Sequence, residues 1–148
     1  TDVAIVAIGV TVWPAMKAAA RLAQEGISAA VVNARFAKPL DTELILKTAK
    51  NVRCLVTVEE GCKMGGFGSA VLETLSEAGV MLRTKILGLP DWYIEQGPQD
   101  LLRERYGLTA DGIYNSVKQL FGAGVVADDA ARLASLVGSL PHGDEQGS

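Results

Sequence analysis

The apolar residues of this chain alternate between two spacings, and that alternation restricts the possible fold more than any other feature. Continuous apolar runs, such as residues 3–8 ended by Gly9, are typical of strands buried on both faces of a parallel sheet. Apolar residues three and four positions apart are typical of helices packed on one face. Strict alternation of the two predicts a three-layer α/β/α domain with a mostly parallel sheet of four to five strands.

Glycine, proline and capping residues set the expected boundaries. We predict strands over residues 3–8, 29–34, 54–58 and 82–87, and helices over 11–25, 44–50, 69–78, 98–106 and 110–121. The first helix has Trp13, Met16, Ala20 and Ala23 on one side, and Asp41 is expected to cap the second. The predicted domain covers residues 1–122. Residues 123–148 form an extension, in which 123–138 could make a weak helix before a polar tail.

Composition excludes several classes of protein. The 148 residues suit one domain with a single core, and no apolar stretch reaches the roughly 18 residues of a membrane span. The net charge is −3 and the cations are scattered, so no nucleic-acid footprint is expected. Two cysteines make no disulfide framework, which favours a reducing, cytoplasmic location. The start at Thr1, without Met or signal peptide, suggests a piece of a larger protein.

Histidine gives the sharpest chemical restriction. The only one, His142, lies in the polar tail. A Ser-His-Asp triad, an HExxH zinc site or a histidine general base would have to use that residue. We therefore predict no catalytic residue and no metal ligand in this chain.

A glycine-rich segment, Gly65–Ser69, follows a strand and opens a helix, where a phosphate could bind free amides. A dinucleotide fingerprint would need a third glycine where Val71 stands, and the next strand ends in Gly88 rather than in an acid for the ribose. We favour close packing of backbone as the role of these glycines. A free-standing flavodoxin-like module that binds a nucleotide or anion remains the alternative from another class.

Two adjacent carboxylates, Glu59 and Glu60, precede this segment. Neighbouring side chains in a strand point to opposite faces, so the pair should not converge on one substrate atom. We expect one of them to pair with Arg35 or Lys63, or to cap a neighbouring turn.

The loops also contain a cysteine and two adjacent aromatic residues. Cys62 has no histidine partner and no CxxC mate, which favours a plain loop cysteine. Trp92 and Tyr93 lie in a loop and serve either as interface anchors or as a cluster covering the end of the sheet.

The loops also carry recognisable motifs: VAIVAIGVTVWP at 3–14, VVNARFAKPLD at 31–41, VTVEE at 56–60 with GGFGSA at 65–70, GLPDWYIEQG at 88–97 and LLRERYGLTADG at 101–112. Over residues 1–121 the chain resembles the C-terminal domain of the 1-deoxy-D-xylulose-5-phosphate synthases, thiamine-diphosphate enzymes of the transketolase superfamily. RF-x-KPLD and VTVEE…GG-x-GS recur across that superfamily, whereas GLPD followed by IEQG points to the synthases. Gly61 departs from the usual Asn. Transketolase itself and the β subunit of 2-oxoacid dehydrogenases are the alternatives within the superfamily.

The resemblance implies a full-length transferase that condenses pyruvate with glyceraldehyde 3-phosphate and feeds isoprenoid (MEP pathway), thiamine and pyridoxal synthesis. Thiamine diphosphate and magnesium would be held by the N-terminal and pyrimidine-binding domains of a homodimer, with none bound here. This domain would be inactive alone, would bind neither nucleic acid nor membrane, and would support packing between domains. The expected interface residues are Arg35, Lys38, Asp41, Glu59, Asp91 and Trp92.

Overall fold

The computed structural model describes residues 1–122. A four-stranded parallel sheet of order β2-β1-β3-β4 forms its middle layer, with β1 at Val3–Ala7, β2 at Ala29–Asn33, β3 at Cys54–Cys62 and β4 at Arg83–Leu89. The helices are α1 (Val12–Gln24), α2 (Thr42–Ala49), α3 (Phe67–Glu77), α4 (Gln99–Arg105) and a last helix over 110–122, and a 3-10 turn, η1 (Gly9–Thr11), precedes α1. The predicted α/β class with a mostly parallel sheet is confirmed. The helix proposed over 123–138 and the tail over 139–148, which contains His142, lie outside the described residues.

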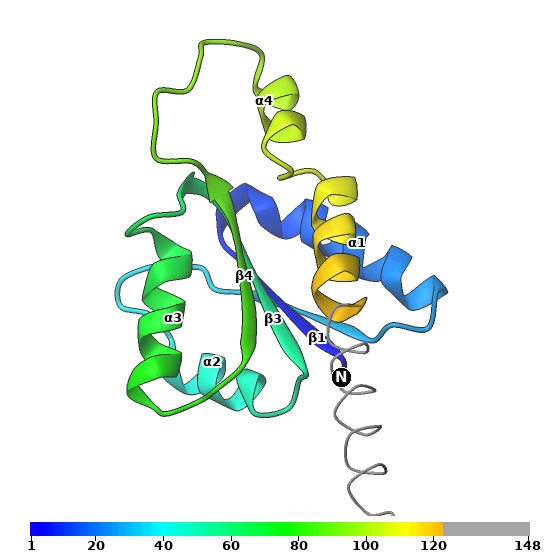
Figure 1. The fold of residues 1–148 in the computed structure, drawn as a ribbon, viewed down its shortest axis with the longest axis vertical. Helices are drawn as coiled ribbons and strands as arrows, with labels where there is room; N and C mark the ends of the chain where they lie inside the picture. The colour runs from blue at the N-terminus through cyan, green and yellow to red at the C-terminus, as the bar shows by residue number, and fades with distance from the viewer. Residues whose placement is uncertain (123–148) are drawn as a thin grey trace, which may run out of the picture.

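Helices cover both faces of the sheet (Figure 1). On one face, Leu22 of α1 and Ile113 of the 110–122 helix pack against Ile5 and other strand residues. On the other face, Ile45 of α2 and Val71 of α3 pack against the alternate side chains of the same strands. All five side chains of β1 are therefore buried, which explains its continuous apolar run.

Helix α1 packs with a different face from the one its larger apolar residues suggest. Ala15, Ala18 and Leu22 are buried against the sheet, whereas Trp13 and Met16 are exposed. Small alanine side chains at the contact let the helix backbone approach the strands closely. The apolar stripe that begins at Trp13 is thus real, but it lies on the outer surface.

Two strands, β3 and β4, extend further toward their carboxyl ends than the apolar runs indicate, whereas β1 and β2 each end one residue earlier than predicted. Strand β3 continues through Glu59 and Glu60 to Cys62, and β4 continues to Leu89. The register shifts between Val58 and Cys62, where four steps along β3 match two along β4. Such an irregularity re-aims the side chains at a strand end. Asp41 caps α2 as predicted, since its carboxylate accepts from the amide of Leu44 at 3.0 Å.

A cluster of charged and aromatic side chains holds the 110–122 helix against α1. The carboxylate of Glu25 accepts hydrogen bonds from Lys118 Nζ (2.7 Å) and from the hydroxyl of Tyr114. Arg21 pairs with Asp111 at 2.6 Å and stacks 3.8 Å from the ring centre of Tyr114. The hydrogen bonds from Lys118 and Tyr114 lower the pKa of Glu25, and the bond to Glu25 raises the pKa of both donors.

We predict that Gly68→Ala destabilises the domain. A Cβ on Gly68 would lie 2.6 Å from Ile86 Cγ2 and 2.6 Å from Thr57 Oγ1, both in packed positions. Overpacking of this kind costs about 1 to 3 kcal/mol of unfolding free energy, measurable by urea denaturation. Gly122→Ala is the matched control, because a Cβ there meets nothing within 4 Å. It should leave stability unchanged or raise it by up to about 1 kcal/mol.

We further predict that the attachment of the 110–122 helix depends on pH in both directions. The lowered pKa of Glu25 means that its contribution is present above the ordinary carboxyl pKa and is lost as pH falls below about 4 to 5. The raised pKa values of Tyr114 and Lys118 mean that their contribution is lost as pH rises beyond about 10. Urea denaturation from pH 3 to 7 should show a shallower acid dependence for Glu25→Gln than for the native chain. Glu77→Gln, an exposed change on α3, should keep the native slope.

Candidate functional site

All four strands run in the same direction, so the loops that leave their carboxyl ends meet at one edge of the sheet. Ligands of open α/β sheets commonly bind at this edge, in the crevice where the strand order reverses or at a helix N-terminus. In this chain the order reverses between β1 and β3, and the nearest helix after β3 is α3. These two positions are the first places to look for a site.

The crevice between β1 and β3 is filled by Thr11 of η1. Its side chain is almost completely buried, and Oγ1 lies 2.8 Å from the carbonyl oxygen of Ile8 and 3.0 Å from that of Val58. The hydroxyl thus ties the turn after β1 to the last apolar residue of the neighbouring strand. A ligand would have to displace this contact to enter the crevice.

The N-terminus of α3 is filled by Glu59. Its side chain is only 4% exposed, and its two oxygens accept from the amides of Phe67 (2.9 Å) and Gly68 (2.8 Å). Gly66, at the N-cap, has no side chain to supply this cap. A carboxylate there satisfies two otherwise unpaired amides and lies at the positive end of the helix dipole. Glu59 therefore occupies the place where a phosphate would bind.

The neighbouring glycines make room for this carboxylate. A Cβ on Gly66 would lie 2.4 Å from Glu59 Oε2, and one on Gly61 would lie 2.8 Å from the same atom. A Cβ on Gly88 of β4 would lie 3.0 Å from Glu59 Cγ. These distances support close packing as the role of Gly66 and of its neighbours Gly61 and Gly88.

The second carboxylate points the other way, as strand geometry requires. Glu60 Oε1 accepts from Arg103 Nε at 2.6 Å, on the side of the sheet opposite to α3. The expected ion pair is present, but its partner is Arg103 of α4 rather than Arg35 or Lys63. The hydrogen bond from Glu60 raises the pKa of Arg103. Nothing local in the sequence indicated this partner, which lies 43 positions away.

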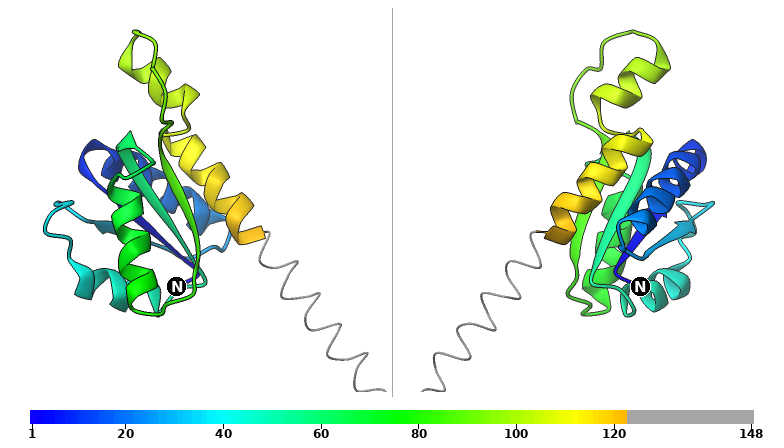
Figure 2. Two further views of the ribbon diagram at one scale, coloured as in Figure 1. Left: turned by 60° about the vertical axis from the view of Figure 1, so that its left-hand side comes forward. Right: turned by 90° about the vertical axis from the view of Figure 1, so that its right-hand side faces the viewer.

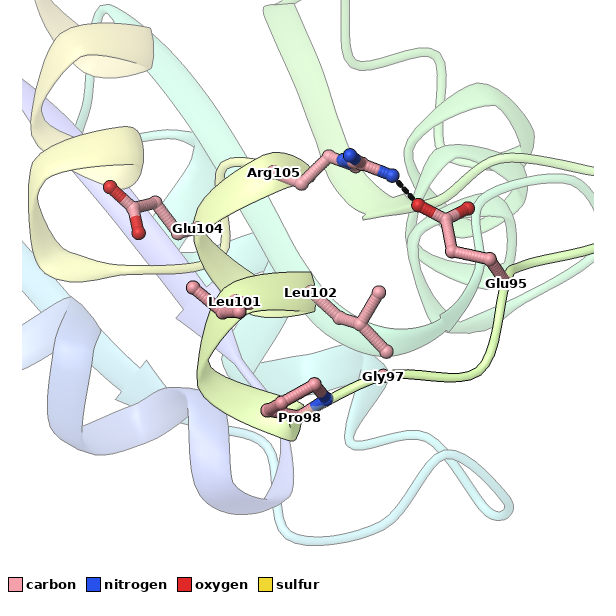
Figure 3. Close-up of a pocket in the computed structure, with 7 residues that line it drawn as sticks. All are labelled: Glu95, Gly97, Pro98, Leu101, Leu102, Glu104 and Arg105. Carbon is pink, nitrogen blue, oxygen red and sulfur yellow. Dashed lines mark ion pairs between the residues drawn. The ribbon is translucent and has the colours of Figure 1, made fainter.

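The segment after β4 projects beyond the edge of the sheet, and we call residues 90–105, the loop together with α4, the arm (Figures 1 and 2). Glu95 of the loop forms an ion pair with Arg105 of α4, which closes the base of the arm (Figure 3). Between loop and helix lies a pocket of about 440 Å³. Its lining includes the apolar side chains of Pro98, Leu101 and Leu102.

The residues predicted at an interface fall into three groups. Arg35, Lys38, Asp91 and Trp92 are exposed at the carboxyl edge. Asp41 is also exposed there, although its carboxylate caps α2. Glu59 differs from the others, because its side chain is buried and its carboxylate accepts from the amides of α3 instead of being exposed.

The two cysteines are free and lie in different environments. Cys62 is the last residue of β3 rather than a loop residue, and its Sγ lies 3.8 Å from Asp91 Oδ1. Cys54 is buried in the core, and burial raises the pKa of its thiol. Within residues 1–122, no three histidine, cysteine or acidic side chains are grouped as metal ligands would be. No helix of that part of the chain is long and apolar enough to cross a membrane.

We predict that Glu59→Gln lowers the unfolding free energy by about 2 to 3 kcal/mol, because one buried amide would face an NH₂ group and the charge-assisted bonds would be lost. Chemical denaturation measures the change. Glu73→Gln, an exposed carboxylate on the same helix, should stay within about 0.5 kcal/mol of the native chain. An equal effect of the two substitutions would contradict a structural role for Glu59.

Comparison with known proteins indicates the family of this chain. Residues 1–113 match the model of the transketolase C-terminal domain. The chain is 52% identical over 123 residues to 1-deoxy-D-xylulose-5-phosphate synthase 1 of Geobacter sulfurreducens, which covers 82% of this chain and 19% of that protein. It is 54% identical over 113 residues to the synthase of Thermomicrobium roseum, covering 76% of this chain and 18% of that protein. The chain thus spans about a fifth of the length of these relatives.

A solved structure agrees in fold. The protein titled "Split gene transketolase, inactive beta4 tetramer" superposes with a TM-score of 0.73 at 39% identity, over 82% of this chain and 38% of that one. The family model, the sequence relatives and the structural match each cover three quarters or more of this chain. The chain therefore belongs to the transketolase C-terminal domain family.

Proposed function

We propose that this chain is the C-terminal domain of a 1-deoxy-D-xylulose-5-phosphate synthase and that it supports the enzyme by packing rather than by chemistry. The relatives that are about half identical to it carry that name, and they are about five times as long as the matched segment. In this proposal the remaining four fifths bind pyruvate, glyceraldehyde 3-phosphate and the cofactor. The whole enzyme is a cytoplasmic homodimer.

The proposal rests on the surface at the carboxyl edge of the sheet, which has exposed apolar side chains but, within residues 1–122, no open ligand position. Thr11 and Glu59 fill the two positions where a ligand would bind, yet large apolar side chains remain exposed around them. The exposed apolar side chains that follow strand ends or belong to the arm are those of Val10, Trp13, Phe36, Met64, Trp92, Tyr93 and Leu101. A surface that combines exposed apolar side chains with no ligand site is typical of a contact with another protein surface. Arg35, Lys38, Asp41, Asp91 and Trp92 would lie at this contact.

The described residues do not fit the cofactor of such an enzyme. Magnesium bound with a diphosphate prefers carboxylate and carbonyl oxygens, and residues 1–122 group no such acidic side chains. The amides of α3 that would suit a diphosphate are taken by Glu59. We therefore assign thiamine diphosphate and magnesium to the other domains. The same contact argues against a flavodoxin-like nucleotide module. The sequence relatives that are about half identical to this chain are named as the synthase, which favours it over transketolase or a 2-oxoacid dehydrogenase.

We predict that the isolated 148-residue chain does not bind thiamine diphosphate with magnesium and does not condense pyruvate with glyceraldehyde 3-phosphate. Isothermal titration calorimetry and a product assay measure the two. The longer protein that contains this domain should do both. Binding at micromolar concentration by the isolated chain would overturn the division of labour, and so would product formed by it alone.

A further inference from the structure

We propose that the arm is the element by which this domain binds the preceding domains. It enters an apolar recess on their surface, and lysine or arginine side chains lie at the rim of that recess. This inference rests on the proposed function, which supplies those domains. It adds a specific element and the chemistry of the surface that receives it.

The loop of the arm carries two adjacent aromatic side chains that stay largely exposed within residues 1–122. Trp92 is 69% exposed and Tyr93 is fully exposed. Both lie in the loop that projects away from the sheet in every view (Figures 1 and 2). Tryptophan and tyrosine dominate the energetics of protein contacts because they bury large areas at low entropic cost. The opposite edge of the sheet exposes Met81, a flexible side chain and not an aromatic pair.

The arm is held in place before any partner arrives. Arg103 ties α4 to β3 through Glu60, and Arg105 ties α4 back to the loop through Glu95 (Figure 3). The hydroxyl of Tyr106 approaches Glu95 at 3.5 Å from the end of the same helix. A segment that is already ordered loses little conformational entropy on binding, which favours its use as an anchor.

The charges of the arm indicate the sign of its partner. Both arginines of the arm are occupied by ion pairs within the domain. Asp91 Oδ1 lies 3.8 Å from the Sγ of Cys62, and Asp100, whose side chain is 96% exposed, forms a 3.4 Å ion pair with Arg103. The arm therefore presents aromatic rings beside the exposed carboxylate of Asp91. Its complement is an apolar recess with cations at the rim.

The occupant that fits is the part of the enzyme that precedes this domain. About four fifths of the length of the relatives lies outside the matched segment, and that part must be joined to this domain by some surface. A second copy of this chain is the competing occupant, and it makes a different prediction for the isolated domain.

The test compares amide hydrogen exchange in the isolated chain with exchange in the longer protein that contains it. We expect residues 90–97 to exchange about tenfold or more slowly in the longer protein, because docking excludes water from the loop. Sedimentation of the isolated chain at two concentrations, with exchange measured at both, provides the control for self-association. Concentration-dependent protection of 90–97 in the isolated chain would assign the recess to a second copy and overturn the inference.

The possible outcomes separate this inference from the proposed function. Protection around η1 and residues 35–38 with none in 90–97 would show that the domain docks without the arm. That result would contradict the role of the arm but not the proposed function. No protection anywhere in the domain would contradict both.

Substitutions sharpen the result. In the longer protein, Trp92→Ala should restore most of the fast exchange in 90–97, whereas Met81→Ala, which alters a 97% exposed side chain on the other edge, should not. Asp91→Asn should weaken the protection less at high salt than at low salt, because screening already reduces its contribution. Trp92→Ala should leave the stability of the isolated chain unchanged, which separates docking from folding. If Trp92→Ala left the slow exchange of residues 90–97 unchanged, Trp92 would not be the proposed anchor.

Discussion

The carboxylate of Glu59 on the first two amides of α3 is the contact on which the arrangement of this edge depends. It substitutes for a side-chain cap that Gly66 cannot provide, and it buries a charge that only hydrogen-bonded amides make tolerable. The close approach leaves no room for Cβ atoms on Gly61 or Gly66. A glycine-rich segment between a strand and a helix therefore serves, in this fold, a carboxylate of the chain itself.

The same contact organises the opposite face of the sheet. Because side chains alternate along a strand, turning Glu59 toward α3 turns Glu60 toward the other layer. There Glu60 meets Arg103 and fixes α4 beside the strand end. The register shift between Val58 and Cys62 lets β3 supply both carboxylates before it pairs again with Leu89. Two adjacent acids thus connect α3, the sheet and the arm without sharing a substrate.

The order of strands and helices could be predicted from the sequence because burial on both faces imposes a continuous apolar run, whereas helices keep a three-to-four spacing. The buried face of α1 could not, since alanines lie on both sides and the two largest apolar residues face outward. The side of the sheet that Glu59 faces follows from the alternation of side chains along β3. Leu55 faces the layer of α2 and α3, and Glu59, four positions later, faces the same layer. The pairing of Arg103 with Glu60 could not be predicted in this way, because the course of the loop that returns α4 to β3 depends on tertiary contacts rather than on a local pattern.

Packing within the domain explains one of its motifs and not another. The role of the VTVEE and GGFGS segments is explained within the domain. Glu59 accepts hydrogen bonds from the first amides of α3, and the glycines allow β3 and α3 to approach each other. The GLPDWYIEQG segment does not, because Trp92 and Tyr93 bury little of their surface within residues 1–122 and so add little to its stability. A motif that serves the fold suits every domain built this way, whereas one that serves a contact suits only domains with a matching partner surface.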